Sequence, residues 1–139
     1  MTSPDAFEVT RVFFVENLKY DSRVLLVEDD PVARWQVRNA IKDHCIISTA
    51  TTAALAMQKF IELKPNLVFL DIDLPDKDGR QILDWIMDIS PRTVVVMLSS
   101  YDHPDIVQRT LEQGAQGFIA KPFQKQDLLR YINISPEDL

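Results

Sequence analysis

Five short apolar runs alternate along the chain with longer stretches that carry apolar residues at helical spacing. Val, Ile, Leu and Phe dominate the runs. Most runs are continuous rather than alternating, which is typical of strands that are covered on both faces. The runs are Arg23–Val27, Cys45–Thr49, Leu67–Leu70, Thr93–Leu98 and Gly117–Ala120. This pattern predicts the five strands of a buried parallel sheet.

The stretches between and after these runs each place apolar residues on one face of a helix. The predicted faces are Ala33, Val37, Ala40 and Ile41; Ala53, Ala56, Met57, Phe60 and Leu63; Ile82, Leu83, Ile86 and Ile89; Ile106, Val107, Thr110 and Leu111; and, in a fifth helix over Gln124–Ile132, Leu128, Leu129 and Ile132. Asp30 before Pro31 predicts a helix start, and Gly114 predicts a helix end. We interpret Trp35 and Trp85 as packing residues on the first and third helices.

Strands and helices therefore alternate as (βα)₅. Crossovers between parallel strands are right-handed, so the helices must cover both faces of an open sheet. We expect a doubly wound α/β domain, a flavodoxin-like three-layer sandwich with strand order 2-1-3-4-5. The predicted domain covers residues 22–134. Residues 1–21 form an extension of unclear structure, in which the Val- and Phe-rich Phe7–Val15 favours a strand, and residues 135–139 form a short tail.

Composition narrows the class of protein. A chain of 139 residues with 46% hydrophobic and 26% charged residues is typical of one globular domain. Its net charge of −6 argues against a nucleic-acid-binding surface, which needs clustered cations. We see no apolar run long enough for a membrane span and no secretory signal, so we expect a cytoplasmic protein without a membrane partner. The only cysteine, Cys45, lies in an apolar run and is predicted to be a buried structural thiol.

Reactive side chains follow four of the five predicted strands. Strand 1 ends in Glu28–Asp30, strand 3 in Asp71, strand 4 in Ser99–Ser100 and strand 5 in Lys121. Ligands of open α/β sheets bind at this carboxyl edge, so we expect these side chains to converge. Each has an ordinary explanation by itself, such as the helix-capping role expected of Asp30. Their presence together at one edge favours a functional site.

The chemistry of this group indicates phosphoryl transfer. Clustered carboxylates repel one another and need a counter-charge, and an all-oxygen site suits Mg²⁺. Lys121 can pair with Asp71 at rest and with a phosphoryl oxygen after transfer. A carboxylate nucleophile, a metal, a lysine and a hydroxyl donor are the groups that this reaction requires.

Four segments, VLLVEDD, LVFLDIDLPDKDG, VVVMLSS and GAQGFIAKPF, resemble in order the hallmark segments of response-regulator receiver domains, the phosphoacceptors of two-component signalling. The resemblance extends from about Arg23 to Ile132. It implies that Asp71 is the phosphoacceptor. It also implies that Glu28, Asp29, Asp71 and the backbone carbonyl of Asp73 bind Mg²⁺, with Mn²⁺ as an alternative ion.

The resemblance also implies which residues respond to phosphorylation. Ser99 would be the hydroxyl that moves to the phosphoryl group, and it replaces the commoner threonine. Lys121 would be the conserved-type lysine, with Pro122 after a cis peptide bond. Phe118 stands at the aromatic switch position in place of the frequent tyrosine, so an apolar switch and a permanently buried ring both remain open.

Two further positions, Asp73 and Tyr101, correspond to those that tune the lifetime of the phosphoryl group in this family. We hypothesise that Tyr101 shields the acyl phosphate from water. The resemblance implies a sensor histidine kinase, a phosphotransfer protein or acetyl phosphate as donor. It further implies that the fourth helix, fifth strand and fifth helix dock an output partner or a second copy. Such a protein catalyses only its own phosphorylation and dephosphorylation and is not a turnover enzyme.

Three alternative functions fit these residues less well. In a haloacid-dehalogenase-like phosphatase, Asp71 would be the nucleophile and Asp73 the acid/base. That family, however, places its nucleophile on the first strand and its acidic pair after the lysine, and it prefers Thr or Val where Leu74 stands. A flavodoxin-type cofactor protein needs a hydroxyl- and glycine-rich loop where this chain is acidic. A degenerate receiver is disfavoured because all reactive groups remain. For His44 and His103 we expect surface or capping roles.

Overall fold

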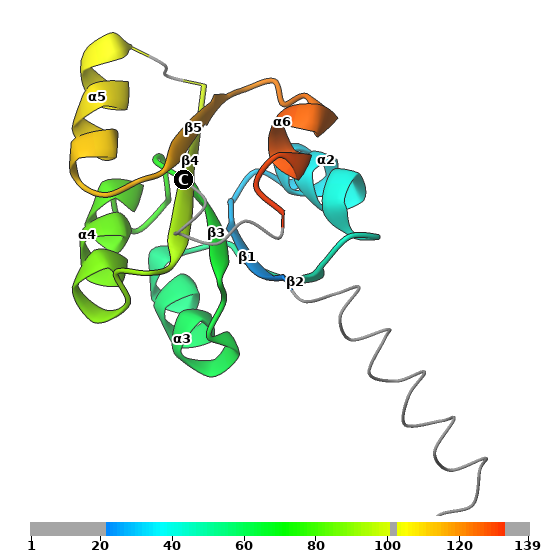
Figure 1. Ribbon diagram of the computed structural model, residues 1–139, viewed down its shortest axis with the longest axis horizontal. Coiled ribbons are helices and arrows are strands. Elements are labelled where there is room, and N and C mark those ends of the chain that lie inside the picture. Colours follow the sequence, from blue (N-terminus) through cyan, green and yellow to red (C-terminus); the bar gives the residue numbers. More distant parts are fainter. Residues whose placement is uncertain (1–21, 101–102, 133–139) are drawn as a thin grey trace, which may run out of the picture.

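The computed structural model describes residues 22–100 and 103–132, and within them five parallel strands alternate with five helices. The strands are β1 (Arg23–Val27), β2 (Ile46–Ala50), β3 (Leu67–Asp71), β4 (Val94–Ser99) and β5 (Gly117–Ala120). The helices are α2 (Pro31–Ile41), α3 (Ala53–Leu63), α4 (Gly79–Ile89), α5 (Pro104–Glu112) and α6 (Lys125–Leu129). The sheet order β2-β1-β3-β4-β5 confirms the predicted doubly wound fold (Figure 1).

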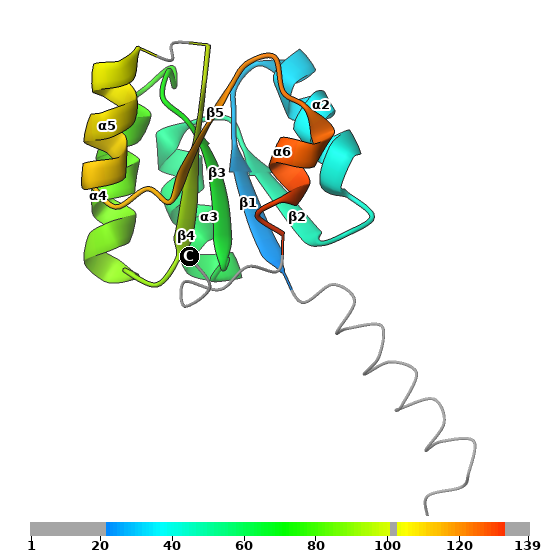
Figure 2. The same cartoon turned by 45° about the horizontal axis from the view of Figure 1, so that its top comes forward.

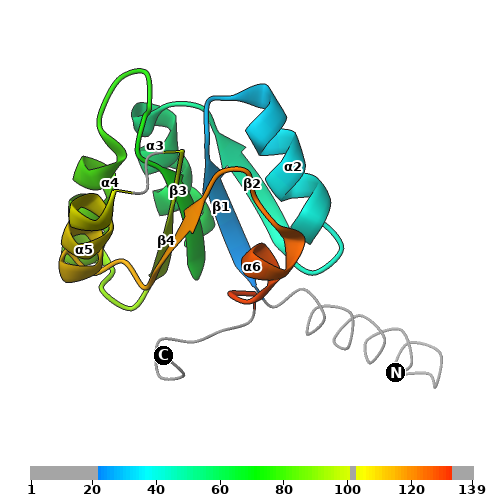
Figure 3. The same cartoon turned by 90° about the horizontal axis from the view of Figure 1, so that it is seen from above.

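The helices form a layer on each face of the sheet (Figure 3). α3, α4 and α5 pack on one face, where Phe60, Leu83 and Ile106 join inward residues of the strands. α2 and α6 pack on the other face, where Val37 and Leu128 belong to a second core cluster. β3 and β4 are buried along their whole length, which explains their continuous apolar sequence. The three predicted layers are therefore present.

Local signals set the helix boundaries. Asp30 Oδ2 accepts a hydrogen bond from the Ala33 amide at 3.1 Å, and Pro31 begins α2, as predicted. Gly114 follows α5 with a φ of 117°, a left-handed conformation that favours glycine. His103 caps α5 by accepting from the Asp105 amide at 3.3 Å, which confirms its capping role.

Several predictions of burial and length were wrong. Trp35 is 64% exposed, because it lies two positions from the buried residues Ala33 and Val37 and so faces away from the sheet. Ile89 and Leu111 are also exposed, and both lie in the last turn of their helices. α6 ends at Leu129, before the predicted Ile132.

Other packing predictions were confirmed. Trp85 is half-buried and meets Phe60 edge-to-face with ring centroids 5.5 Å apart. Cys45 is buried just before β2, and burial raises the pKa of its thiol to about 11, so it is an inert packing residue. No helix in the two described ranges is long and apolar enough to cross a membrane. Phe7–Val15, Tyr101 and residues 135–139 lie outside the described residues.

Candidate functional site

The carboxyl ends of β1, β3, β4 and β5 lie at the same edge of the sheet (Figure 2). Val27 of β1 lies opposite Leu70 of β3, so the residues that follow them, Glu28 and Asp71, emerge side by side. Glu28 is fully buried and Asp71 is 3% exposed. The parallel register therefore brings two carboxylates from distant parts of the sequence to one point.

Glu28, Asp29 and Asp71 form the acidic cluster predicted from the sequence. One carboxylate oxygen from each lies within 4.8 Å of the others. The β1–α2 loop that carries the first two is held by Arg34, whose Nη1 donates to the carbonyl oxygens of Asp29 at 2.9 Å and Glu28 at 3.3 Å. The Glu28 amide donates to the Ala50 carbonyl at 3.0 Å, which joins this loop to the end of β2.

Lys121 is the cation of the cluster. Its ammonium forms an ion pair with Glu28 Oε1 and lies 3.6 Å from Asp71 Oδ1. The predicted pair with Asp71 is thus present, but Glu28 is the nearer partner. Burial by itself lowers the pKa of Lys121, but the two carboxylates outweigh it and raise the pKa above its ordinary value. The Lys121–Pro122 peptide bond is cis, as predicted.

Asp71 is strongly perturbed. Burial, followed by the hydrogen bond and charge of the Glu28 carboxyl, raises the pKa of Asp71 from 3.8 to about 7. The Lys121 charge and the Asp73 amide, which donates to Asp71 Oδ1 at 3.3 Å, lower the pKa without cancelling that rise. The positive charge of Lys121 therefore does not fully balance the negative charge of the carboxylates.

This arrangement fits a divalent cation. The buried Glu28 Oε1 is paired with the Lys121 charge but accepts no hydrogen bond of ordinary geometry. The three clustered side chains offer only oxygen atoms as ligands, and two of these side chains, those of Glu28 and Asp71, are buried. Their combined negative charge is larger than the positive charge of Lys121. Hard oxygen donors with excess negative charge are the ligands that Mg²⁺ prefers.

The remaining predicted residues lie around the cluster. Ser99 is fully buried at the end of β4, and its carbonyl accepts from the Lys121 amide at 2.9 Å. Asp73 lies in the β3–α4 loop with its side chain exposed. Phe118 is half-buried against the core cluster that faces α3, α4 and α5. The structure thus places Ser99 and Asp73 at the same edge as the acids, whereas Tyr101 falls outside the described residues.

Sequence reasoning missed three residues that shape the site. Arg34 braces the acidic loop, and Asp76 bonds to the start of α3. Gly79 begins α4 so close to Asp71 that an added Cβ would lie 2.0 Å from the Asp71 carbonyl oxygen. The Asp78–Gly79 pair was a usable signal for this close approach. Arg34 and Asp76 carried no such signal, because their partners are backbone groups set by the fold.

Comparisons with known proteins agree with this geometry. The family model described as response regulator receiver domain matches residues 24–133. The chemotaxis protein CheY of Listeria monocytogenes is 34% identical over 112 residues, which cover 79% of this chain and 94% of that protein. A CheY-like receiver domain from Methanospirillum hungatei superposes with a TM-score of 0.74 at 28% identity, covering 80% of this chain and 90% of the other. A protein-glutamate methylesterase of Geobacter sulfurreducens is 36% identical over 103 residues, which are 72% of this chain and 28% of that protein.

Proposed function

The chain belongs to the response regulator receiver domain family of two-component signalling, and on this premise we propose that it is switched by phosphorylation of Asp71. A sensor histidine kinase or a phosphotransfer protein would be the donor. The observation that carries the proposal is the cluster of Glu28, Asp29 and Asp71, whose carboxylate oxygens lie within 4.8 Å of one another, beside the ammonium of Lys121. The family membership also favours a receiver over the phosphatase considered from the sequence.

The Asp71 carboxylate is the proposed nucleophile. One of its oxygens forms a bond to phosphorus while the bond from phosphorus to the donor histidine breaks, so the product is an acyl phosphate and a free imidazole. Glu28, Asp29, Asp71 and the Asp73 carbonyl would hold Mg²⁺, which when bound neutralises charge on the phosphoryl oxygens. The elevated pKa of Asp71 favours a site whose nucleophile needs added positive charge to stay ionised at neutral pH.

Lys121 and Ser99 are the proposed responders to the new phosphoryl group. Lys121 is already shared between Glu28 and Asp71, so a small movement would bring its ammonium to a phosphoryl oxygen. Ser99 ends β4 directly before the β4–α5 connection, and a hydrogen bond from its hydroxyl would draw that connection towards Asp71. Phosphorylation would thereby shift the population between two arrangements of the surface formed by α5, β5 and α6.

That surface is the proposed contact for an output partner or a second copy of the chain. Phe118 of β5 and Ile106 of α5 are both half-buried and pack against the same core cluster. The partial exposure of Phe118 leaves its ring room to move, so we propose it as an apolar switch. Tyr101 and the Asp73 side chain are proposed to set the lifetime of the acyl phosphate. If Tyr101→Ala loses its phosphoryl group no faster than wild type, the shielding role of Tyr101 is wrong.

The central test is phosphorylation by acetyl phosphate, followed by intact mass spectrometry with Mg²⁺ or with a chelator. We expect wild type to gain one phosphoryl group only with Mg²⁺, and Asp71→Asn to gain none. Asp88→Asn, which changes an exposed acid on α4, is the matched control and should behave as wild type. An undiminished, metal-independent signal in Asp71→Asn would overturn the proposal.

A further inference from the structure

The β3–α4 loop, residues 72–78, carries the Asp73 carbonyl that the proposed function uses, and the following inference rests on that function. Backbone contacts hold the two ends of the loop. At its start, the Ile72 amide donates to the Leu98 carbonyl of β4 at 3.3 Å, and the Asp73 amide donates to Asp71 Oδ1 at 3.3 Å. At its end, the Gly79 amide donates back to the Ile72 carbonyl at 2.7 Å, and an isolated bridge pairs Asp73 with Asp78. None of these contacts involves residues 75–77, the middle of the loop.

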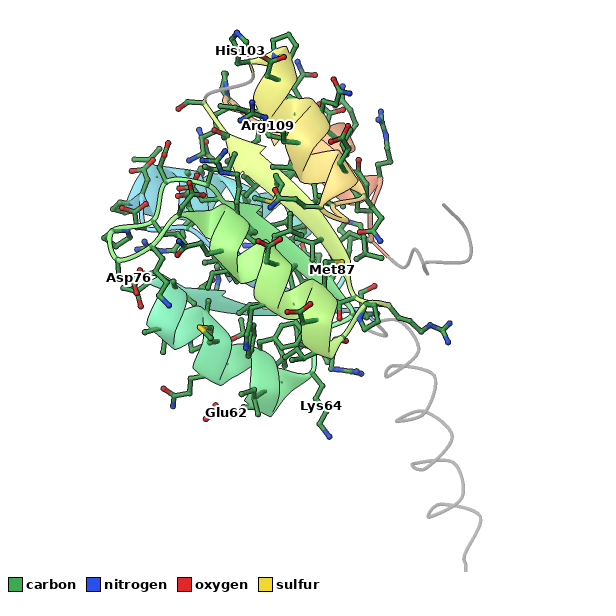
Figure 4. The ribbon with its side chains drawn as sticks, turned by 90° about the vertical axis from the view of Figure 1, so that its left-hand side faces the viewer. Glu62, Lys64, Asp76, Met87, His103 and Arg109 are labelled. Atoms are coloured by element: carbon green, nitrogen blue, oxygen red, sulfur yellow. The ribbon has the colours of Figure 1, made fainter. Side chains whose placement is uncertain are left out.

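Asp76 connects the middle of the loop to the start of α3. Its Oδ1 accepts from the Ala53 amide at 2.8 Å and its Oδ2 from the Ala54 amide at 3.0 Å. Both amides belong to the first turn of α3, far from Asp76 in the sequence. Figure 4 shows Asp76 on the loop beside the start of this helix. One carboxylate thus bridges two loops of the carboxyl edge.

The start of α3 is built to receive this carboxylate. Thr52 caps the helix locally, and its hydroxyl oxygen accepts from the Leu55 amide at 3.1 Å. The first turn of α3 contains no acidic residue, so Asp76 is the acid that meets the positive end of the helix dipole. The two amide hydrogen bonds lower the pKa of Asp76, which keeps the carboxylate charged at neutral pH.

The same helix start is tied to the acidic cluster. Ala50, the last residue of β2, accepts from the Glu28 amide at 3.0 Å, and α3 begins shortly after it at Ala53. A continuous set of contacts therefore runs from Glu28 through the end of β2 and the start of α3 to Asp76. β2 is the strand that supplies no reactive side chain, and its connection to α3 provides the anchor for the loop that carries Asp73.

We propose that Asp76 is a positioning residue that latches the β3–α4 loop to the start of α3 and so holds the Asp73 carbonyl in place for the divalent cation. Asp76 is exposed and makes no contact with Glu28, Asp29 or Asp71 among those described, so it acts through the loop backbone. The bidentate geometry matters because a single exposed hydrogen bond would compete poorly with water.

The test compares Asp76→Ala with Thr52→Ala. Both changes remove hydrogen bonds from the first turn of α3, but only Asp76→Ala releases the loop. Amide hydrogen exchange, measured by NMR on the folded, metal-free protein, should become about fivefold faster at Asp73 in Asp76→Ala and stay unchanged there in Thr52→Ala. Mg²⁺ affinity, from titration of amide chemical shifts, should fall by about three- to tenfold in Asp76→Ala only.

Asp76→Asn separates the latch from simple charge. It removes the negative charge but keeps one acceptor oxygen, so the latch predicts an affinity between those of wild type and Asp76→Ala, including at raised ionic strength. Equal losses in Asp76→Asn and Asp76→Ala that disappear with salt would overturn the proposal in favour of long-range charge. An equal loss of Mg²⁺ affinity in Thr52→Ala would overturn it in favour of helix stability.

The latch and the proposed function fail in different ways. If wild type binds no Mg²⁺ and accepts no phosphoryl group, the proposed function is wrong. If wild type does both and Asp76→Ala matches it in Mg²⁺ affinity and in exchange at Asp73, the latch alone is wrong.

Discussion

The pKa values of acidic side chains shift in opposite directions at two kinds of place in this domain, the ends of strands and the starts of helices. At the end of β3, burial and a second carboxyl raise the pKa of Asp71 to about 7. At the start of α4, the Arg80 side chain and amide lower the pKa of Asp78, whose Oδ1 accepts from that amide at 2.9 Å. Asp78 stabilises the fold by being charged, whereas Asp71 opposes folding when it is charged.

The difference lies in the donors that each carboxylate meets. Helix starts offer unpaired amides and a positive dipole end, so an acid there replaces water with good donors. Strand ends at this edge offer mainly other carboxylates and one lysine. A cluster that costs stability is typical of a functional site, which agrees with the proposed binding of a cation and transfer of a phosphoryl group.

The largest expected effect is the loss of the Lys121 ammonium, which forms ion pairs with both buried carboxylates of the cluster. Lys121→Met leaves Glu28 and Asp71 without their ion-pair partner, and we expect a destabilisation of about 3 kcal/mol in metal-free buffer at neutral pH. Chemical denaturation followed by circular dichroism measures this. Lys125→Met, at an exposed position on α6, should change the stability by less than about 0.5 kcal/mol. Equal effects of the two variants would break the comparison.

Removing one negative charge from the strand-end cluster should stabilise the protein, the opposite of the effect of Lys121→Met. Asp71→Asn relieves repulsion with Glu28 and leaves that residue paired with Lys121, so we expect the metal-free protein to gain about 2 kcal/mol at pH 8. The gain is measured by urea denaturation and should vanish at pH 5, where Asp71 is already protonated. A destabilised Asp71→Asn would show that the acid supports the fold.

The pH dependence of stability follows from the same shift. The folded protein binds a proton at Asp71 more tightly than the unfolded chain, because the pKa is about 7 instead of 3.8. The resulting stabilisation is complete below pH 3.8 and is lost as the pH rises through about 7. Metal-free wild type should therefore lose about 1 to 2 kcal/mol between pH 5 and pH 8, measured by urea denaturation at each pH. Saturating Mg²⁺ should reduce this loss by binding the charged form.

Acids at helix starts should give the opposite pH dependence of stability. The pKa of Asp78 is lowered, so the stability it contributes is present above the ordinary pKa of 3.8 and is lost below it. A stability that stays flat from pH 5 to pH 8 in metal-free Asp71→Asn, together with the fall in wild type, would assign the neutral-pH titration to the strand-end cluster.

The smallest effect concerns Asp30, an acid next to the cluster in sequence that caps α2. Asp30→Ala removes the hydrogen bond to the Ala33 amide, and we expect a loss of about 1 kcal/mol that is the same with and without Mg²⁺. Thermal unfolding in both buffers measures it. A loss that depends on Mg²⁺ would place Asp30 in the metal site and blur the distinction between the two kinds of acid.

The fold was predictable because its signals are local or periodic. Continuous apolar runs located β3 and β4, Asp30 and Pro31 located the start of α2, and Gly114 marked the end of α5. Predictions of burial failed at the ends of helices. Ile89 continues the helical period of its neighbours, but it is the last residue of α4 and is exposed.

The convergence of Glu28, Asp71 and Lys121 was predictable because parallel strands bring their carboxyl ends to one edge. The choice of partners among the charged groups of the site was not predictable. Lys121 lies nearer to Glu28 than to Asp71, and Asp76 bonds to backbone amides of another loop. Such contacts depend on loop paths and side-chain rotamers, which leave no periodic trace in the sequence.

The layer formed by α2 and α6 also affects how the protein is made on the ribosome. α2 emerges directly after the first strand, whereas α6, which packs against it and contributes the buried Leu128, is translated after the last strand. The apolar stripe of α2 that contains Val37 and Ile41 therefore lacks this partner until residues 125–129 have been synthesised. We expect a chain shortened before α6 to leave part of this stripe exposed to water.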